Sequence, residues 1–583
     1  MAVAEAPARA VFGPDFARRL WQLVRLYWTS PEAAKGGLLL AGAVALELAT
    51  VFGTFVLAEA QRGIFDALQL KEVAAFLQGI GLFLAAVLGY VLSSAFRIYL
   101  RQLLEIRWRR WLTGYFLAEW ISPHACCQME LHRSAADNPD QRIAEDVRNF
   151  VASALGLSLS LLAALATLVS FAGLLWSLSG DWPLRIGRTE LRIPGLMMWV
   201  AFVYAGIATW ITHRAGRRLV PINFDRLRFE ADFRFTLVRF RESAAAVALS
   251  RGEAREQERA LDGFSQIVRN WWELIRAQRN LALLTISIGQ ANVAIPLLLA
   301  APGYFLGRLT LGSVAQTGIA YAQVSSALTW FVNAYQELAQ WRASIERLFT
   351  LGDAIDDTQA QLARAGVAIV STDDPELRLR ELCLALPNGR VLLERASASI
   401  APGDRVVVLG PSGAGQTILF RAILGHWPFG SGRIEIPTGA RMEFLSQRPY
   451  LPIASLREAV SYPDADRSFS DPEIREALRA VGLPQLAEWL SETDHWEKRL
   501  SAGEQQRLSL ARVLLHAPGW IFLDDATSAL DEEAERRMYE LLAERLPKSA
   551  IVSVAHRPAV VRYHGRRWTL VPREDGAAVL EVA

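Results

Sequence analysis

Eight consecutive residues have the types and spacing of a phosphate-binding loop. They read GPSGAGQT and comprise Gly410, Pro411, Ser412, Gly413, Ala414, Gly415, Gln416 and Thr417. In the pattern G-x-x-x-x-G-K-[ST], backbone N–H groups surround the phosphates, the lysine reaches the outer phosphates and the hydroxyl binds Mg²⁺. Here Gln416 stands at the lysine position, whereas Thr417 keeps the hydroxyl. The stretch therefore predicts a phosphate cradle that lacks its usual positive charge.

The segments around this loop are those that a phosphate cradle requires. Residues 404–409 (DRVVVL) predict a strand, and residues 418–424 (ILFRAIL) predict a helix. Backbone N–H groups and a helix N-terminus attract phosphate oxygens whatever residue stands at position 416. After Trp341 the apolar runs are short and alternate with turn residues, which is typical of an α/β domain.

Before about residue 340, the chain is apolar over stretches long enough to cross a bilayer, which takes roughly 20 residues. Overall the 583 residues are 52% hydrophobic, with a mean hydropathy of +0.19. We predict six spans: Gly36–Ala58, Phe76–Phe96, Phe150–Leu178, Ile193–Thr212, Leu281–Leu306 and Ser313–Glu337. The last span carries Gln316, Gln323 and Asn333, so we expect it to face water. A single apolar run fits a buried core helix equally well, but six in series do not.

Basic residues predict the orientation of these spans. Arginines are dense after spans two and four, as in Arg97–Arg110 and Arg214–Arg228, and sparse after spans one, three and five. Basic segments stay in the cytoplasm, so both termini are expected there. An arginine-bearing amphipathic stretch, Pro14–Thr29, predicts a helix on the membrane surface, and no cleavable signal peptide is visible. The net charge of +2 gives no indication of nucleic-acid binding.

The three cysteines, Cys126, Cys127 and Cys383, lie on segments predicted to be cytoplasmic. Adjacent cysteines do not form an ordinary disulfide, and no metal-ligand spacing accompanies them. We therefore expect them to be structural or incidental.

Further polar motifs follow the phosphate loop in order. They are FLSQRPY at 444–450, LSAGEQQR at 500–507, WIFLDD at 520–525 followed by ATSALD, and SVAHR at 553–557. Each alone fits a strand end or a helix start, but all of them in this order over about 150 residues resemble the ATPase domain of ABC transporters. Six spans followed by one such domain resemble a half-transporter of the exporter-type fold.

The resemblance implies a role for each motif residue. Two ATPase domains would close over ATP, with Ser501 and Gly503 of one chain completing the site of the other, which implies a homodimer. Asp524 and Gln447, together with Thr417, would hold Mg²⁺. The implied catalytic residues are Gln447, Asp525 and His556. Asp525 stands where the family has a glutamate that polarises the attacking water.

Other stretches narrow the resemblance. The segments 137–143 (DNPDQRI), 230–235 (EADFRF), 241–244 (RESA) and 252–253 (GE) resemble the membrane domain of BacA/SbmA-type transporters. LGHWP at 424–428 and QRPYLP at 447–452 resemble subfamily D of the ABC proteins. Coupling elements are expected near 138–146 and 246–253. Two features depart from the pattern: Ala245 replaces a common glutamate, and residues 382–388 hold no aromatic side chain to stack on adenine.

These observations predict an α-helical membrane domain of six spans, preceded by an amphipathic elbow helix, and an α/β P-loop ATPase domain. The expected boundaries are 1–35 for the N-terminus with the elbow, 36–340 for the spans, 341–370 for a linker and 371–583 for the ATPase domain. We expect a multi-pass protein of the bacterial inner membrane whose partners are the bilayer, a transported solute and a second copy of itself.

The expected activity is ATP-driven transport of a peptide or other large hydrophilic solute, with an acyl-CoA-like molecule as the less favoured choice. The alternative is a regulatory subunit whose ATPase site has decayed, paired with a different chain, and Gln416 and Asp525 favour it. A soluble ATPase fused to an apolar segment is excluded by the ordered coupling motifs.

Glu47 lies near the middle of the first span. A carboxylate that faces lipid there costs roughly 2.5–3.5 kcal/mol. Glu47 is therefore expected to face the transport path or to be protonated, with a structural hydrogen bond to a neighbouring helix as the equal alternative.

Overall fold

The structure, a computed structural model, describes residues 14–122, 129, 138–179, 183–186, 189–363, 366–411, 413–464, 468–554, 557–573 and 576–583. The chain divides into two compact units. One consists of the described residues within 1–117 and 138–349, and the other of those within 118–137 and 350–583. Cys126, Cys127, Ser412 and His556 lie outside the described residues.

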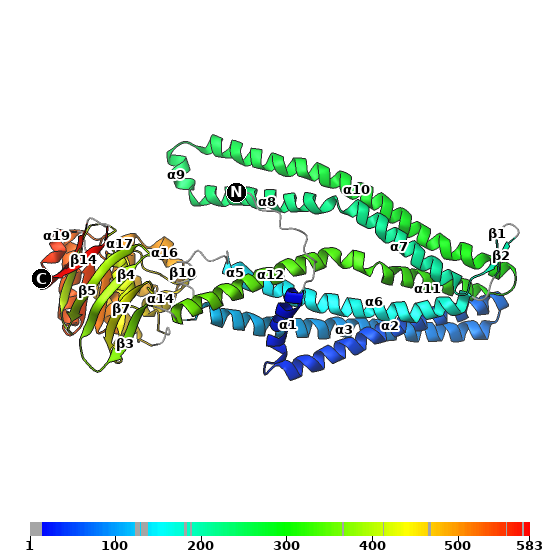
Figure 1. Ribbon diagram of the computed structural model, residues 1–583, viewed down its shortest axis with the longest axis horizontal. Helices are drawn as coiled ribbons and strands as arrows, with labels where there is room; N and C mark the ends of the chain where they lie inside the picture. The colour runs from blue at the N-terminus through cyan, green and yellow to red at the C-terminus, as the bar shows by residue number, and fades with distance from the viewer. Residues whose placement is uncertain are drawn as a thin grey trace. The chain divides into compact units, whose positions relative to one another are not determined.

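The first unit is built from long helices (Figure 1). The helical elements, long and short, are α1 (Pro14–Trp28), α2 (Ala33–Leu70), α3 (Val73–Trp120), α5 (Pro139–Gln141), the π-helical turn η1 (Arg142–Asp146), α6 (Val147–Ser179), α7 (Leu196–Gly216), α8 (Leu219–Glu242), α9 (Ala244–Leu249), α10 (Glu253–Phe305), α11 (Leu311–Leu328) and α12 (Trp330–Ala363). The last residues of α3, from 118, and of α12, from 350, belong to the second unit. A two-stranded antiparallel ribbon, β1 (Pro183–Ile186) and β2 (Thr189–Arg192), joins α6 to α7.

Five described helical segments are long and apolar enough to cross a membrane: 33–70, 73–120, 139–179, 196–242 and 253–305. They contain the first three predicted spans in full, the fourth from residue 196 and the fifth up to residue 305. The sixth, Ser313–Glu337, stays a prediction, and the structure divides it between α11 and α12. Thr329, at the break, donates its hydroxyl to the carbonyls of Ser325 and Ser326. Such back-bonding by threonine bends helices, which accounts for the interruption.

The N-terminal helix α1 is anchored by its last turn. Tyr27 is fully buried, and its ring stacks on Trp108 of α3 at 5.4 Å between centroids. Arg107, next to that tryptophan, donates to Glu32 at 3.1 Å. The amphipathic stretch therefore forms a helix as predicted, while its position on the membrane surface stays a prediction.

The second unit contains a ten-stranded sheet with helices. Its strands are β3 (Val367–Thr372), β4 (Leu377–Ala385), β5 (Val391–Ile400), β6 (Arg405–Leu409), β7 (Gly430–Pro437), β8 (Met442–Leu445), β11 (Trp520–Asp524), β12 (Ala550–Val554), β13 (Arg566–Pro572) and β14 (Ala578–Val582). Their order is β3-β7-β4-β5-β14-β13-β6-β12-β11-β8. The five strands β13, β6, β12, β11 and β8 are parallel to one another.

Helices pack against this sheet and form a second layer. They are α13 (Gln416–Ile423), α14 (Leu456–Ser461), α15 (Asp471–Ala480), the 3₁₀ turn η2 (Pro484–Glu488), α16 (Trp496–Arg499), α17 (Ala502–His516), α18 (Glu532–Arg545) and α19 (Pro558–Val561). A short pair of strands, β9 (Ala454–Ser455) and β10 (Thr493–Asp494), lies beside them. Buried side chains of β6, β12 and α13 form one core, and those of α14, α15 and α17 form another.

The predicted division into four segments stays a prediction. The predicted linker, residues 341–370, contains residues 341–363 of α12, which continues as a helix to Ala363. Residues 118–122 and those from 350 onward belong to the same compact unit. Gln359 of α12 donates to Glu119 at 3.0 Å within that unit.

Candidate nucleotide site

The phosphate loop connects β6 to α13, as its sequence predicts. Val406, Val407 and Val408 are fully buried, so the strand that leads into the loop is fixed by the core. Gly413 and Gly415 have φ angles of +85° and +97°, a left-handed backbone that glycine adopts without strain. The loop can therefore turn its N–H groups inward at the N-terminus of α13.

The side chain of Gln416 is 6% exposed, and its amide Nε2 donates to the carbonyl of Gly410 at 3.1 Å. The substituted residue thus spans the loop and hydrogen-bonds to its first residue. A lysine here would bring a positive charge to the same place, whereas the amide brings only a neutral donor. The Gln416 amide therefore connects the two ends of the loop, but it lacks the charge that would attract phosphate.

The carboxyl ends of neighbouring parallel strands bring the other motifs to the same edge of the sheet. The phosphate loop follows β6, Asp524 ends β11, and Gln447 comes two residues after β8. In the register, Val554 of β12 lies between Val408 and Asp524. This edge is where open α/β sheets bind ligands.

Thr417, Asp524 and Gln447 offer a hydroxyl, a carboxylate and an amide at this edge, and Mg²⁺ prefers oxygen ligands with one or two carboxylates plus substrate phosphates. The donor set fits Mg²⁺ bound together with a nucleotide. The structure thus places the predicted metal ligands and the phosphate loop together, while their roles stay predictions.

Asp525 has a left-handed backbone with a φ angle of +50°. Its N–H donates to Val554 at 3.3 Å, and its carbonyl accepts from Ser528 at 3.1 Å. These bonds fix the turn after β11 beside the end of β12. His556 follows β12 but lies outside the described residues, as does Ser412 of the phosphate loop.

Two residues without a role predicted from the motifs, Gln506 and Arg557, hydrogen-bond to the loop 526–531. Gln506 of α17 donates to the Gln447 carbonyl at 2.9 Å and accepts from the Ala529 N–H at 3.0 Å. Arg557 donates to the carbonyls of Ser528 and Leu530. Gln506 belongs to the LSAGEQQR run, so its position was visible in the sequence, but its bonds to Gln447 and Ala529 were not.

Ser501 is the N-cap of α17 and forms a capping box with Glu504. The Ser501 N–H and hydroxyl both donate to one Glu504 oxygen, at 2.9 and 2.8 Å. These bonds, the backbone one first, lower the pKa of Glu504 from its ordinary value. Helix α17 packs against α14 and α15, and Ser501 is exposed at its N-terminus. A Cβ atom at Gly503 would approach the Ala529 carbonyl to 3.2 Å, which is tighter than usual contact.

Arg512 of α17 supports the segment that follows Gln447. It is 6% exposed and donates to the carbonyls of Ala459 and Tyr450. Burial lowers the pKa of Arg512 to about 10. The guanidinium connects α14, α17 and the QRPYLP segment.

A directed chain of hydrogen bonds lies beneath the end of β12. His564 Nδ1 lies 2.9 Å from the Val560 carbonyl, which only accepts, so this nitrogen carries the proton. Nε2 therefore accepts from the Ser553 hydroxyl at 2.9 Å, and Ser553 accepts from the Tyr539 hydroxyl at 3.2 Å. Burial lowers the pKa of His564, so the ring is kept neutral.

The region expected to contact adenine has no aromatic side chain on its exposed surface at 382–388, as the sequence indicates. Trp427 contacts this region from the protein interior, where it is 4% exposed. Its indole N–H donates to the Ala385 carbonyl at 2.9 Å. It supports the strand without offering a ring to a base. Cys383, half-buried on β4, accepts from the Arg395 N–H at 3.3 Å, consistent with the expected structural role.

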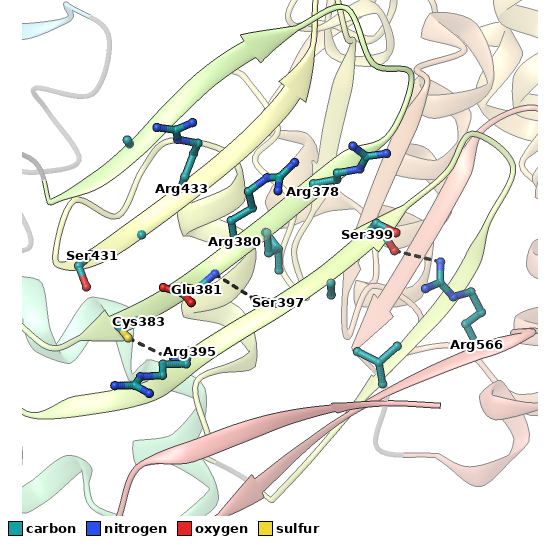
Figure 2. A pocket seen from close by; sticks show the side chains of 15 residues that line it. Arg378, Arg380, Glu381, Cys383, Arg395, Ser397, Ser399, Ser431, Arg433 and Arg566 are labelled. Atoms are coloured by element: carbon teal, nitrogen blue, oxygen red, sulfur yellow. Dashed lines mark hydrogen bonds between the residues drawn. The ribbon is translucent and has the colours of Figure 1, made fainter.

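A separate groove of about 1290 Å³ lies across β4, β5 and β7 and is rich in arginine (Figure 2). Several of these arginines pair with carboxylates: Arg378 with Asp374 at 2.7 Å, Arg380 with Glu435 at 2.7 Å and Arg566 with Asp404 at 2.6 Å. None of the predicted nucleotide-site residues that the structure describes lines this groove. It is therefore distinct from the candidate nucleotide site.

In the first unit (described residues within 1–117 and 138–349), which we call the membrane unit, Glu47 of α2 is 4% exposed. It accepts hydrogen bonds from Arg97 of α3 at 2.7 and 2.9 Å. A structural bond to a neighbouring helix was one of the two expectations for Glu47, and the structure has that bond. Its participation in transport stays a prediction.

The two expected coupling regions are both irregular. Asn138 has a φ angle of +53° before α5, and η1 follows as a π-helical turn. Arg347 of α12 binds Asp146 of this turn at 2.5 and 2.7 Å. In the other region, the short helix α9 connects α8 to α10, which lie side by side (Figure 1). Coupling itself stays a prediction.

Known protein families match both parts of this chain, the transmembrane region and the ATP-binding domain. The family model "ABC transporter transmembrane region 2" matches residues 23–305, and the model "ABC transporter" matches residues 393–528. The inner membrane ABC transporter ATP-binding protein YddA of Escherichia coli is 33% identical, over 92% of this chain and 94% of its own. An uncharacterized ABC transporter ATP-binding protein of Synechocystis is 34% identical, over 88% of this chain and 78% of its own.

More distant relatives include the chloroplastic ABC transporter D family member 2 of Arabidopsis thaliana, which is 28% identical over 94% of this chain and 85% of its own. A bacterial Atm1-family ABC exporter with ATP bound has the same fold. Its TM-score is 0.68 at 17% identity, over 93% of this chain and 94% of that one. The chain therefore belongs to the ABC transporter family, as a half-transporter that joins a type 2 transmembrane region to one ATP-binding domain.

Proposed function

We propose that this protein is one half of a homodimeric ABC transporter that moves a peptide or other large hydrophilic solute across the bacterial inner membrane, with both termini in the cytoplasm. The observation that carries the proposal is the common edge of the sheet. There the phosphate loop follows β6, Asp524 ends β11 and Gln447 follows β8. These groups serve a nucleotide phosphate and its metal in a chain that also has membrane-spanning segments.

In this proposal the chain's own groups act on ATP as follows. The N–H groups of the loop and of α13 bind phosphate oxygens, and Thr417, Asp524 and Gln447 hold Mg²⁺, which supplies charge neutralisation on the phosphates. Asp525 orients the attacking water, and His556 donates to the outer phosphate. Ser501 and Gly503 of a second copy close the site, because the exposed N-terminus of α17 presents N–H groups to an anion.

Hydrolysis is proposed to be slow. Gln416 contributes a hydrogen bond but no charge, and its amide is already bonded to Gly410 at 3.1 Å. Asp525 is one methylene shorter than glutamate, which withdraws its carboxylate by about 1.5 Å, and a misplacement of that size costs about 100-fold in rate. ATP binding would then supply most of the work of the transport cycle.

The composite site is tested by mixing two inactive chains. Ser501→Arg blocks the closing helix, and Gly415→Val, at a φ of +97°, disables the loop. Co-expressed, the two form mixed dimers with one intact site, so ATPase activity should return to roughly a quarter of the starting value under random pairing. A monomer that hydrolyses ATP at the starting rate, or mixtures without any activity, would contradict the homodimer.

Transport itself is tested in reconstituted vesicles. Labelled peptides and acyl-CoA are offered on either side, with and without Mg-ATP. ATP-dependent movement of the peptide supports the proposed substrate class. If only acyl-CoA moves, the substrate class is acyl-CoA and the peptide assignment is wrong.

A second candidate function is a regulatory half that pairs with a different, catalytically competent chain. Gln416 and Asp525 together favour it. Purification from native membranes distinguishes the two: a different half-transporter recovered in equal amount supports the regulatory half, and a single species supports the homodimer.

A further inference from the structure

A groove of about 650 Å³ lies between α7/α8 and α10 in the membrane unit. Its lining combines arginines with apolar and aromatic side chains: Trp210, Ile211, Arg214, Ala215, Arg218, Ile222, Glu273, Arg276, Ala277, Asn280, Leu281 and Leu284. We call it the α7–α10 groove. It is separate from the nucleotide site and from the Glu47–Arg97 pair.

Two hydrogen bonds fix the groove at its ends. Tyr204 of α7 donates to the Ile288 carbonyl of α10 at 2.5 Å, and Asn270 of α10 donates to the Ile222 carbonyl of α8 at 3.2 Å. The two bonds fit one antiparallel alignment of α7/α8 with α10, in which each step forward along α7/α8 matches one step back along α10. Arg276 therefore lies level with Gly216, between Arg214 and Arg218 along the opposite wall.

Among the described residues that line the groove, positive charges outnumber negative ones. Three arginines and one carboxylate, Glu273, line it, which leaves two positive charges. No ion pair joins Arg214, Arg218 or Arg276 to a carboxylate within the part of the chain that the structure describes. Arg276 donates its Nε to the Trp272 carbonyl, and the rest of its guanidinium remains available. The arginine groove of Figure 2 differs, because several of its guanidinium groups have carboxylate partners.

The groove lies where the apolar segments end. The predicted fourth span ends at Thr212 and the fifth begins at Leu281, so the three arginines stand just outside both. Trp210, 68% exposed, lies on the membrane side of the arginines, where tryptophan side chains occupy the interface. Leu281 and Leu284 continue the groove towards the apolar segment of α10. The charged part of the groove is thus followed by an apolar part, just as the charged headgroup of a phospholipid is followed by its acyl chains.

We propose that the α7–α10 groove binds the headgroup of an anionic phospholipid. The phosphate lies among Arg214, Arg218 and Arg276, and Trp210 and Leu284 contact the start of the acyl chains. Basic pockets at the membrane boundary between spanning helices bind such headgroups. The lipid offsets the repulsion among three guanidinium groups and holds α7 and α8 against α10.

The test uses the purified full-length protein in neutral detergent. It is equilibrated with equal amounts of phosphatidylglycerol and phosphatidylcholine that have the same acyl chains, and the bound lipids are counted by native mass spectrometry. We expect phosphatidylglycerol to be preferred. The triple variant Arg214→Gln, Arg218→Gln, Arg276→Gln should lose tenfold or more of that preference, since each arginine near a membrane surface contributes about fivefold.

A matched triple variant controls for net charge. Arg226→Gln, Arg234→Gln and Arg269→Gln remove the same charge from α8 and α10 outside the groove. This variant should keep the preference of the starting protein. An unchanged preference in the groove variant, or an equal loss in the control, overturns the proposal. If the groove triple does not fold, Arg276→Gln alone should lose about fivefold.

Two further measurements decide the occupant. Glu273→Gln removes the one carboxylate in the groove and should raise the preference for phosphatidylglycerol several-fold, and a fall overturns the proposal. Inorganic phosphate at millimolar concentration should not displace the lipid. If it does, the groove binds free anions and the lipid assignment is wrong.

Discussion

Replacing Gln416 with lysine restores the one charge that the phosphate loop lacks. An ammonium about 3 Å from a phosphate oxygen, at an effective dielectric near 20, has a gross attraction of about 5 kcal/mol. Gln416 is only 6% exposed, so burying the ammonium costs several kcal/mol and offsets much of that gain. We expect a net gain of ~2 kcal/mol, which is about 30-fold in the dissociation constant of ATP.

The assay is equilibrium binding of Mg-ATP to the full-length chain, followed by steady-state ATPase measurement. Gln416→Met is the matched control, because it has a similar length and no charge and also loses the 3.1 Å bond to Gly410. The control should bind ATP no more tightly than the starting protein. If Gln416→Lys and Gln416→Met bind ATP equally, charge at this position does not govern affinity and the reasoning fails.

Hydrolysis is measured with the same set, extended by Asp525→Glu and the double variant. The two changes act on one chemical step, so their effects on the rate need not add. The double variant should be the fastest of the set. A double variant no faster than the starting chain would show that neither position limits turnover.

Three other changes probe polar contacts described above, each read by thermal unfolding of the full chain. Glu47→Gln leaves Arg97 without its carboxylate and should lower the free energy of unfolding by roughly 3–5 kcal/mol. Adding Arg97→Gln removes the unpaired charge and should recover part of that loss. A double variant with no recovery would refute the pairing. His564 has a lowered pKa in the folded state, so the unfolded chain binds more protons, and stability should fall as pH drops below about 6.5 and level off below the folded pKa. His564→Gln should lessen this fall, and equal slopes would contradict the account. Arg512→Met leaves buried carbonyls unpaired and should lower the free energy of unfolding by about 3 kcal/mol. The matched change Arg479→Met, at an exposed arginine, should lower it by under about 1 kcal/mol. Equal losses would refute the role of Arg512 in supporting the segment after Gln447.

The nucleotide site could be predicted from sequence because each motif directly follows a buried strand. Val406–Val408 and Ile521–Leu523 are apolar over their whole length, which is the pattern of central parallel strands. In such a sheet the polar residues that follow the strands meet at one edge, so the order of motifs alone placed Thr417 and Asp524 together.

The bonds that hold the loops could not be predicted in this way. Arg557 reaches the carbonyls of Ser528 and Leu530 from 27 residues or more along the chain, and nothing in its local sequence marks that contact. The Glu47–Arg97 pair likewise depends on the relative rotation of α2 and α3, which an almost uniformly apolar helix does not specify. The break at Thr329 was missed because the hydropathy of the segment continues across it.

The left-handed backbone at Asp525 affects which amino acids selection enriches at position 525. Aspartate, asparagine and glycine adopt positive φ more readily than glutamate does, since a short polar side chain can bond to its own backbone. Selection for folding yield alone would therefore enrich the short residues, and selection for turnover would enrich glutamate. A saturation library at codon 525, sorted once for expression and once for ATP-dependent growth, should rank these substitutions in opposite orders.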